Sequence, residues 1–267
     1  MTTAVLPLSP AARRRQLRHA WDVISVLVGR DLKVLYKRSI VGVGWALAQP
    51  LLQLVIFTFV FRRVLAVDVE NFASFALTGV LVWGWFQASL VQSTGLITNN
   101  RALVRQPRFP LSLLPHVTIG VRLFHFLLAM PILAALLWYQ GLRPSAPWLI
   151  LPLLIVIQFV LTAGIAYPLA ALNVHLRDTQ HVVAVLLQLG LYLTPIFYSL
   201  DHVPPAYRAF LHINPMVPMI EAWRDVLLRG EWPDPRTLAT LAVVAVILLV
   251  IGRRIFVRQS HHFVEDL

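Results

Sequence analysis

The 267-residue chain contains no cysteine. This absence excludes disulfides, thiolate catalysis and cysteine-ligated metal sites. Charged residues are also scarce, at 13% of the chain, whereas 58% of the residues are hydrophobic. An ordinary soluble domain is about 25% charged. The composition therefore indicates an integral membrane protein, and one membrane domain accounts for the whole length.

Sequence motifs for common active sites are missing as well. The chain has no G-x-x-x-x-G-K-[ST] to hold nucleotide phosphates, no H-E-x-x-H and no G-x-S-x-G. We therefore predict no catalytic residue, no resident cofactor and no metal, and the energy for any work on a substrate must come from a partner or a gradient. His261 and His262 stand near Glu265 and Asp266, but a solvated tail explains this group better than a metal site.

The formal net charge of +11 has two interpretations. In a soluble chain it would indicate a nucleic-acid partner. In a membrane protein the same excess of Lys and Arg is expected at the cytoplasmic face. We follow the second interpretation and predict no nucleic-acid partner.

Long uncharged runs predict an all-α protein with six transmembrane helices. These are expected over 39–61, 72–95, 117–139, 148–172, 179–199 and 236–256. A seventh span over Ala206 to Leu228 would move Arg253, Arg254 and Arg258 to the outside, against the distribution of positive charge. With six spans and both termini in the cytoplasm, most of the 23 Lys and Arg residues lie inside.

Two segments are not expected to cross the membrane. Residues 11–38 alternate apolar and basic side chains at helical spacing, with Ile24, Val28 and Leu32 on the apolar side, which predicts an amphipathic helix in the inner interface. Residues 200–230 are rich in proline and too often charged to span, so we predict a re-entrant hairpin of two short helices on the outer (periplasmic or extracellular) face. Because broken backbone at membrane depth needs cover from protein or a water-filled cavity, this hairpin predicts a pathway beside it.

Charged side chains argue against two other classes of membrane protein. An ion-driven transporter usually places carboxylates within its spans, and none is found there. A membrane-embedded transferase would need paired acidic metal ligands, for which Glu221 and Asp225 are the one candidate; Arg224 and Arg229 beside them favour a capped surface helix. Apart from Arg236, Arg253 and Arg254 at the ends of the last span, Arg122 is the one charge within a span, and it fits either a helix partner or an anionic cargo.

A series of short motifs runs in order along nearly the whole chain. They are Arg30-Asp31-Leu32-Lys33-Val34, Trp45-Ala46-Leu47-Ala48-Gln49-Pro50-Leu51, Gly79-Val80-Leu81-Val82-Trp83, Arg108-Phe109-Pro110, Leu172-Asn173-Val174, Thr194-Pro195-Ile196-Phe197-Tyr198, Asn214-Pro215-Met216 and Glu221-Ala222-Trp223-Arg224. With these motifs the sequence resembles the permease subunits of ABC polysaccharide exporters, the O-antigen (Wzm-type) and teichoic acid group of the ABC-2 class.

The resemblance implies a homodimer bound to two copies of a separate ATPase, which holds ATP and Mg, in the cytoplasmic (inner) membrane. The cargo it implies is a polysaccharide carried on a polyprenyl pyrophosphate lipid. Residues 101–115 would form the coupling helix that docks on the ATPase, and the outer hairpin would be a gate. The coupling residues are Arg101, Arg105, Arg108, Phe109 and Pro110, and the gate residues are Pro195, Asn214, Pro215, Glu221 and Arg224.

A sugar polymer needs a lining that binds weakly along the whole path, which aromatic faces provide. The candidates near mid-span or next to the hairpin are Phe57, Trp83, Trp85, Phe86, Tyr192 and Tyr198, for which plain packing stays an equal alternative. Cations at the inner face could meet a pyrophosphate or attract lipid headgroups. These are Arg30, Lys33, Lys37 and Arg38.

Two other functions remain open on the sequence alone. A related ABC-2 permease could export a small lipophilic compound, such as a drug or a lipid, and would then keep a narrow closed cavity. A scaffold subunit would show no stimulation of the ATPase by lipid-linked glycan.

Overall fold

The computed structural model describes residues 22–33, 71–106, 109–200, 203–211 and 213–263, together with a few residues between 44 and 60. Within these residues every regular element is a helix. Most of the first predicted span, 39–61, and both ends of the predicted interface helix, 11–21 and 34–38, lie outside the described residues.

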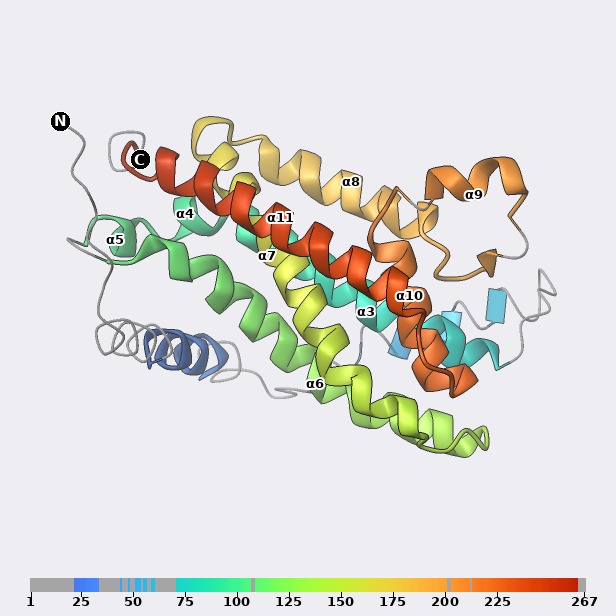
Figure 1. Ribbon diagram of the computed structural model, residues 1–267. Coiled ribbons are helices and arrows are strands. Elements are labelled where there is room, and N and C mark those ends of the chain that lie inside the picture. The colour runs from blue at the N-terminus through green and yellow to red at the C-terminus, as the bar shows by residue number, and fades with distance from the viewer. Residues whose placement is uncertain are drawn as a thin grey trace, which may run out of the picture.

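Four helices are long and apolar enough to cross a membrane: α3 (Phe72–Thr94), α6 (Leu114–Tyr139), α7 (Leu151–His175) and α11 (Pro235–Gln259). The 3-10 helices η2 (Leu111–Leu113) and η3 (Ala146–Ile150) lead into α6 and α7. Figure 1 shows α3 behind α7 and α11, with α6 along the lower edge of the bundle in this view. This is the helical membrane architecture that the composition indicates; a count of six spans stays a prediction.

The fifth predicted span is shorter than expected. The sequence predicts a helix over 179–199, but α8 (Thr179–Leu193) ends six residues earlier. Thr194 is extended, with ψ 137°, because the residue before a proline disfavours helical geometry and Pro195 follows. The 15 residues of α8 span about 22 Å, less than the ~30 Å hydrocarbon core.

The segment predicted as a coupling helix, 101–115, is broken. It holds α5 (Arg101–Val104), after α4 (Leu96–Asn99), then a turn, η2 and the start of α6. Pro110, directly before η2, interrupts a continuous helix because proline removes a backbone donor and clashes with the preceding turn. The described residues of this segment form short helical pieces, and its role as the coupling region stays a prediction.

The helix over 22–33 lies against the α5 end of the bundle (Figure 1). Its most buried side chain is Leu27, which joins a cluster with Ile97, Val117 and Val174. Val28 on the same face would lie 3.5 Å from a Cβ on Gly120 of α6. Ile24 and Val28, which the apolar spacing places on the packed side, lie against the same cluster as Leu27.

Candidate functional site

The stretch after α8 contains two short helices at the end of the bundle opposite α5 (Figure 1): α9 (Pro205–Leu211) and α10 (Met216–Arg224). A π-helical turn, η5 (Asp225–Arg229), follows α10 and ends at Gly230, whose φ is 67°. A positive φ suits glycine because it has no Cβ. This turn brings Arg229 back towards the side chains of Glu221 and Asp225.

Asn214 starts α10 and ties it to the end of α8. Its Oδ1 accepts a hydrogen bond from the Met216 amide at 3.0 Å, and its Nδ2 donates to Thr194 Oγ1 at 3.0 Å. Thr194 Oγ1 donates in turn to the Gly190 carbonyl at 2.7 Å. A short polar side chain that bonds the first backbone amides is what a helix start requires.

α10 packs into the main apolar core of the bundle. Met216, Met219, Ile220 and Trp223 are all buried there. The Trp223 ring meets Phe126 of α6 edge-on, with 5.4 Å between the centroids. The sequence predicts a capped surface helix around Glu221 and Asp225, and that expectation is wrong for most of α10, because its apolar face is enclosed by α3, α6 and α7.

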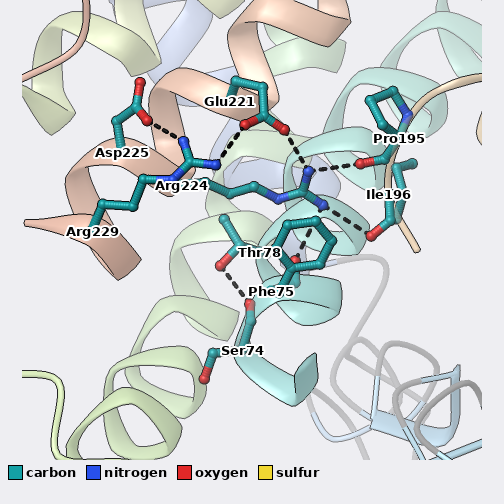
Figure 2. A network of polar contacts seen from close by, with 9 residues as sticks. All are labelled: Ser74, Phe75, Thr78, Pro195, Ile196, Glu221, Arg224, Asp225 and Arg229. Atoms are coloured by element: carbon teal, nitrogen blue, oxygen red, sulfur yellow. Dashed lines mark hydrogen bonds and ion pairs between the residues drawn. The ribbon is translucent and has the colours of Figure 1, made fainter. Parts of the chain in front are cut away.

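Arg224 lies at the centre of this site, and its side chain is fully buried (Figure 2). Nη1 donates to the Pro195 carbonyl at 2.7 Å and to Glu221 Oε1 at 2.8 Å. Nη2 donates to the Ile196 carbonyl at 2.9 Å and to the Phe75 carbonyl at 3.4 Å. The guanidinium also lies over the Phe75 ring, 3.4 Å from its centroid. One cation therefore joins α10, the segment after α8 and the first turns of α3.

The helix that receives Arg224 has a glycine at the contact point. A Cβ on Gly79 of α3 would come within 3.1 Å of Arg224 Nη2 and of Ile196 Cγ2. The missing side chain gives the guanidinium room to reach the α3 backbone. Isolated buried charge costs several kcal/mol, and a carboxylate, three carbonyls and an aromatic face together compensate it.

Glu221 is shared between two arginines (Figure 2). Its Oε1 pairs with Arg224, and its Oε2 accepts from Arg229 Nη2 at 3.1 Å. Arg229, which is 43% exposed, also pairs with Asp225. Burial lowers the pKa of Arg224 to about 10 against the opposing effect of Glu221, so the guanidinium stays charged near neutral pH. Burial raises the pKa of Asp225, and the hydrogen bond from Arg229 opposes that shift.

Four of the five predicted gate residues therefore belong to one connected group. Pro195 supplies a carbonyl, Asn214 caps the start of α10, and Glu221 and Arg224 form an ion pair. Pro215 precedes the first residue of α10. Both Nη atoms of the buried guanidinium bond within the chain, while its Nε is buried without a hydrogen-bond partner. This cation therefore holds elements together and is not accessible to a passing anion.

The aromatic candidates fall into two sets. Trp83, Trp85 and Phe86 of α3 are buried within the single chain, and Trp85 stacks on Phe126 with 5.2 Å between centroids. Tyr192, at the end of α8, is 57% exposed, and Tyr198 is half-buried. Packing within the chain thus accounts for the first set, while Tyr192 is accessible. Phe57 lies outside the described residues.

The inner-face candidates do not form one cluster. Arg30 pairs with the neighbouring Asp31 at 2.8 Å, and Lys33 is exposed. Arg101 and Arg105 are exposed on and after α5, whereas Phe109 and Pro110 are half-buried. Lys37, Arg38, Arg108, Glu265 and Asp266 lie outside the described residues. Arg122 donates from Nε to Gln92 Oε1 of α3 at 2.8 Å. This contact favours the interpretation of Arg122 as a partner of a neighbouring helix.

One polar group was missed by sequence reasoning. Trp83 Nε1 donates to Gln87 Oε1 at 3.1 Å, and Gln87 Nε2 donates to Gln188 Oε1 at 3.3 Å, which links α3 to α8. Gln188 is exposed nine residues after the first residue of α8. An amide in an apolar helix was the available signal, because polar side chains at membrane depth usually face the bundle interior or a water-filled cavity.

Comparisons with known proteins agree on one family. The model of the family described as ABC-2 type transporter matches residues 22–228. The chain is 32% identical over 252 residues to an O-antigen export system permease protein RfbA of Klebsiella pneumoniae, covering 94% of this chain and 97% of that protein. It is 31% identical over 255 residues to the protein of the same name in Myxococcus xanthus, covering 95% and 98%.

A more distant relative is the polysialic acid transport protein KpsM of Escherichia coli. It is 23% identical over 239 residues, which cover 87% of this chain and 92% of that protein. All three similarities cover at least 87% of this chain.

Proposed function

Because the chain belongs to the ABC-2 type transporter family, we propose that it is the membrane permease subunit of an ATP-driven exporter of a cell-surface polysaccharide. The observation that carries this proposal is the similarity over nearly the full length of two relatives whose names describe O-antigen export. A relative named for polysialic acid transport supports the same class of cargo.

The energy source is a separate chain. The sequence has no phosphate-binding loop, so ATP and Mg are bound by an ABC ATPase, of which two copies serve a permease homodimer. α5 and the turn after it, with Arg101, Arg105 and Phe109, are the surface on which the ATPase docks. The protein lies in the cytoplasmic membrane with both termini inside, in agreement with the distribution of Lys and Arg.

The cargo is a glycan attached to a polyprenyl pyrophosphate lipid. The path of this glycan passes along the surface of α8 beside α3, where the exposed Gln188 and Tyr192 lie. An exposed amide at this depth is costly against lipid. In contact with water the amide has hydrogen-bond partners, and amide and aromatic groups together suit a sugar polymer. Arg30 and Lys33 at the inner interface are the cations that attract the pyrophosphate.

Deletion of the gene, with complementation, tests the function. We expect lipid-linked polymer to accumulate on the cytoplasmic side and the surface glycan to disappear, and the intact gene to restore both. An unchanged surface glycan would contradict the proposal. Sensitivity to a lipophilic drug, with normal glycan, would instead favour the exporter of small compounds.

Reconstitution of the permease with its ATPase tests the energy source. In vesicles, we expect movement of lipid-linked glycan to require ATP hydrolysis and to continue when an ionophore removes the proton gradient. An ATPase variant that binds but does not hydrolyse ATP is the control. Transport that stops with the ionophore and not with the ATPase variant would contradict the proposal.

A further inference from the structure

We propose that Arg224 is a positioning residue that keeps α10 fixed to α3 and to the segment after α8, and that the outer end of the path opens by movement of α9. The three fixed elements form a frame that stays together. The inference rests on the proposed export function and assigns different roles to the two short helices of the outer hairpin.

The first step is that α10 is tied to the segment after α8 at both of its ends. At its start, Asn214 Nδ2 donates to Thr194 Oγ1 at 3.0 Å. At its end, Arg224 donates to the Pro195 and Ile196 carbonyls at 2.7 and 2.9 Å. Two attachments about one helix length apart prevent both translation and rotation of α10 against this segment.

The second step is that Arg224 extends this attachment to a third element. Its Nη2 donates to the Phe75 carbonyl at 3.4 Å, and its guanidinium lies on the Phe75 ring, in the space left by Gly79. If α10 left α3, this carbonyl and the guanidinium would lose their partners inside an apolar core, which is costly for polar and charged groups. The three elements therefore move together.

The ion pair at the surface is not what holds α10. Arg229 binds Glu221 and Asp225 but is partly exposed, so water can replace its bonds. Loss of Arg229 would leave the three carbonyl bonds of Arg224 in place. The buried cation, and not the exposed one, therefore sets the position of α10.

α9 is held much more weakly. Tyr207 is 65% exposed and Phe210 is 66% exposed, and none of the α9 side chains whose burial is described is buried. Figure 1 shows α9 apart from α10, beyond the end of α8. Arg208 of α9 is half-buried, and its Nε donates to the Val203 carbonyl just before the helix at 2.8 Å. Displacement of α9 therefore uncovers little apolar surface and breaks no bond of Arg224, so this helix can move while α10 stays in place.

The natural absence of cysteine gives a clean test, because each introduced cysteine is the only thiol. Phe210→Cys reports on α9, and Ile220→Cys reports on α10, where the side chain is fully buried. Each variant is reconstituted with the ATPase, and its reaction with a membrane-impermeant maleimide is followed from the outside with and without ATP and lipid-linked glycan. Transport is measured in the same vesicles.

We expect turnover to change the labelling rate at position 210 several-fold and to leave position 220 unlabelled in every state. Labelling at position 220 during turnover would overturn the inference even though transport is intact. Lack of transport by the unmodified protein would instead contradict the proposed function, so the two failures are distinguishable.

Variants of Arg224 provide the second readout. Arg224→Gln in the Ile220→Cys background should make position 220 reactive without ATP and lower transport at least tenfold, while ATP hydrolysis continues. Arg224→Lys should not restore protection, because one ammonium cannot replace the two-armed guanidinium. Arg236→Gln, at an exposed site at the start of α11, is the matched control and should leave both readouts unchanged. Protection at position 220 in Arg224→Gln would overturn the inference.

Discussion

Gly252 of α11 lies directly against Gly164 of α7: a Cβ on Gly252 would come within 2.2 Å of the Gly164 carbonyl oxygen. In the other direction, a Cβ on Gly164 would lie 2.6 Å from the Leu249 amide nitrogen. Two glycines therefore let two membrane helices touch through their backbones, as small residues commonly do in membranes.

Gly252→Ala should force these helices apart. We expect a loss of about 1–3 kcal/mol, the usual cost of overpacking, measured as a lower thermal unfolding midpoint in detergent. Gly84→Ala is the matched control because nothing lies within 4 Å of a Cβ there; it should stabilise α3 by up to ~1 kcal/mol. Equal effects of the two substitutions would contradict the close crossing of α7 and α11.

The sequence alone is sufficient to predict the helical class of fold and the two short helices between α8 and α11, because long apolar runs and prolines act locally. The end of α8 was misplaced by six residues, although Pro195 carries the signal: the apolar run continues past it. Apolarity reports on the surroundings of a segment, and only backbone chemistry decides where a helix stops.

Burial of charge could not be predicted in the same way. Arg224 and Arg229 are five residues apart and equally basic in the sequence, yet one is fully buried and the other is 43% exposed. What separates them is the position of carbonyls from Pro195, Ile196 and Phe75, which are distant in the sequence. The Gln87–Gln188 contact depends in the same way on how α3 and α8 pack.

Asn173 organises the turn between α7 and α8. Its Oδ1 accepts from the Gln180 amide at 3.1 Å, and its Nδ2 donates to Thr98 Oγ1 of α4 at 3.4 Å. Asn173→Ala should remove both bonds at a buried site and lower stability by about 1–3 kcal/mol. Unfolding midpoints compared with His181→Ala, an exposed site in the first turn of α8, check this. A smaller effect at 173 than at 181 would show that the turn does not depend on the amide.

Asp234 caps α11, and its carboxylate should make the free energy of unfolding depend on pH. Its carboxylate accepts from the Thr237 amide at 3.0 Å and from Thr237 Oγ1 at 2.7 Å, and these bonds lower its pKa below 3.8. Because the folded pKa is the lower one, the stabilisation is complete above pH 3.8 and is lost as the pH falls through the folded value.

The corresponding measurement compares wild type with Asp234→Asn between pH 7 and pH 3. The difference in unfolding midpoint should favour the wild type at pH 7 and shrink below about pH 4, the ordinary range for an aspartate. A difference that is independent of pH would mean that the charge of Asp234 does not contribute.

Gln188 distinguishes a water-filled path from a lipid-facing surface at α8. If the exposed amide meets water and sugar, Gln188→Leu should lower glycan export several-fold, and the unfolding midpoint should fall only slightly, because the one bond that Gln188 accepts from Gln87 is lost. If it meets lipid, the same change removes a polar group from an apolar environment and should stabilise the protein while export is unchanged. Val185→Leu, an exposed apolar site one turn earlier, is the control. Export by the reconstituted transporter and thermal unfolding of the same preparation separate the two outcomes, because the path predicts lower export without a higher midpoint, whereas lipid contact predicts a higher midpoint with unchanged export.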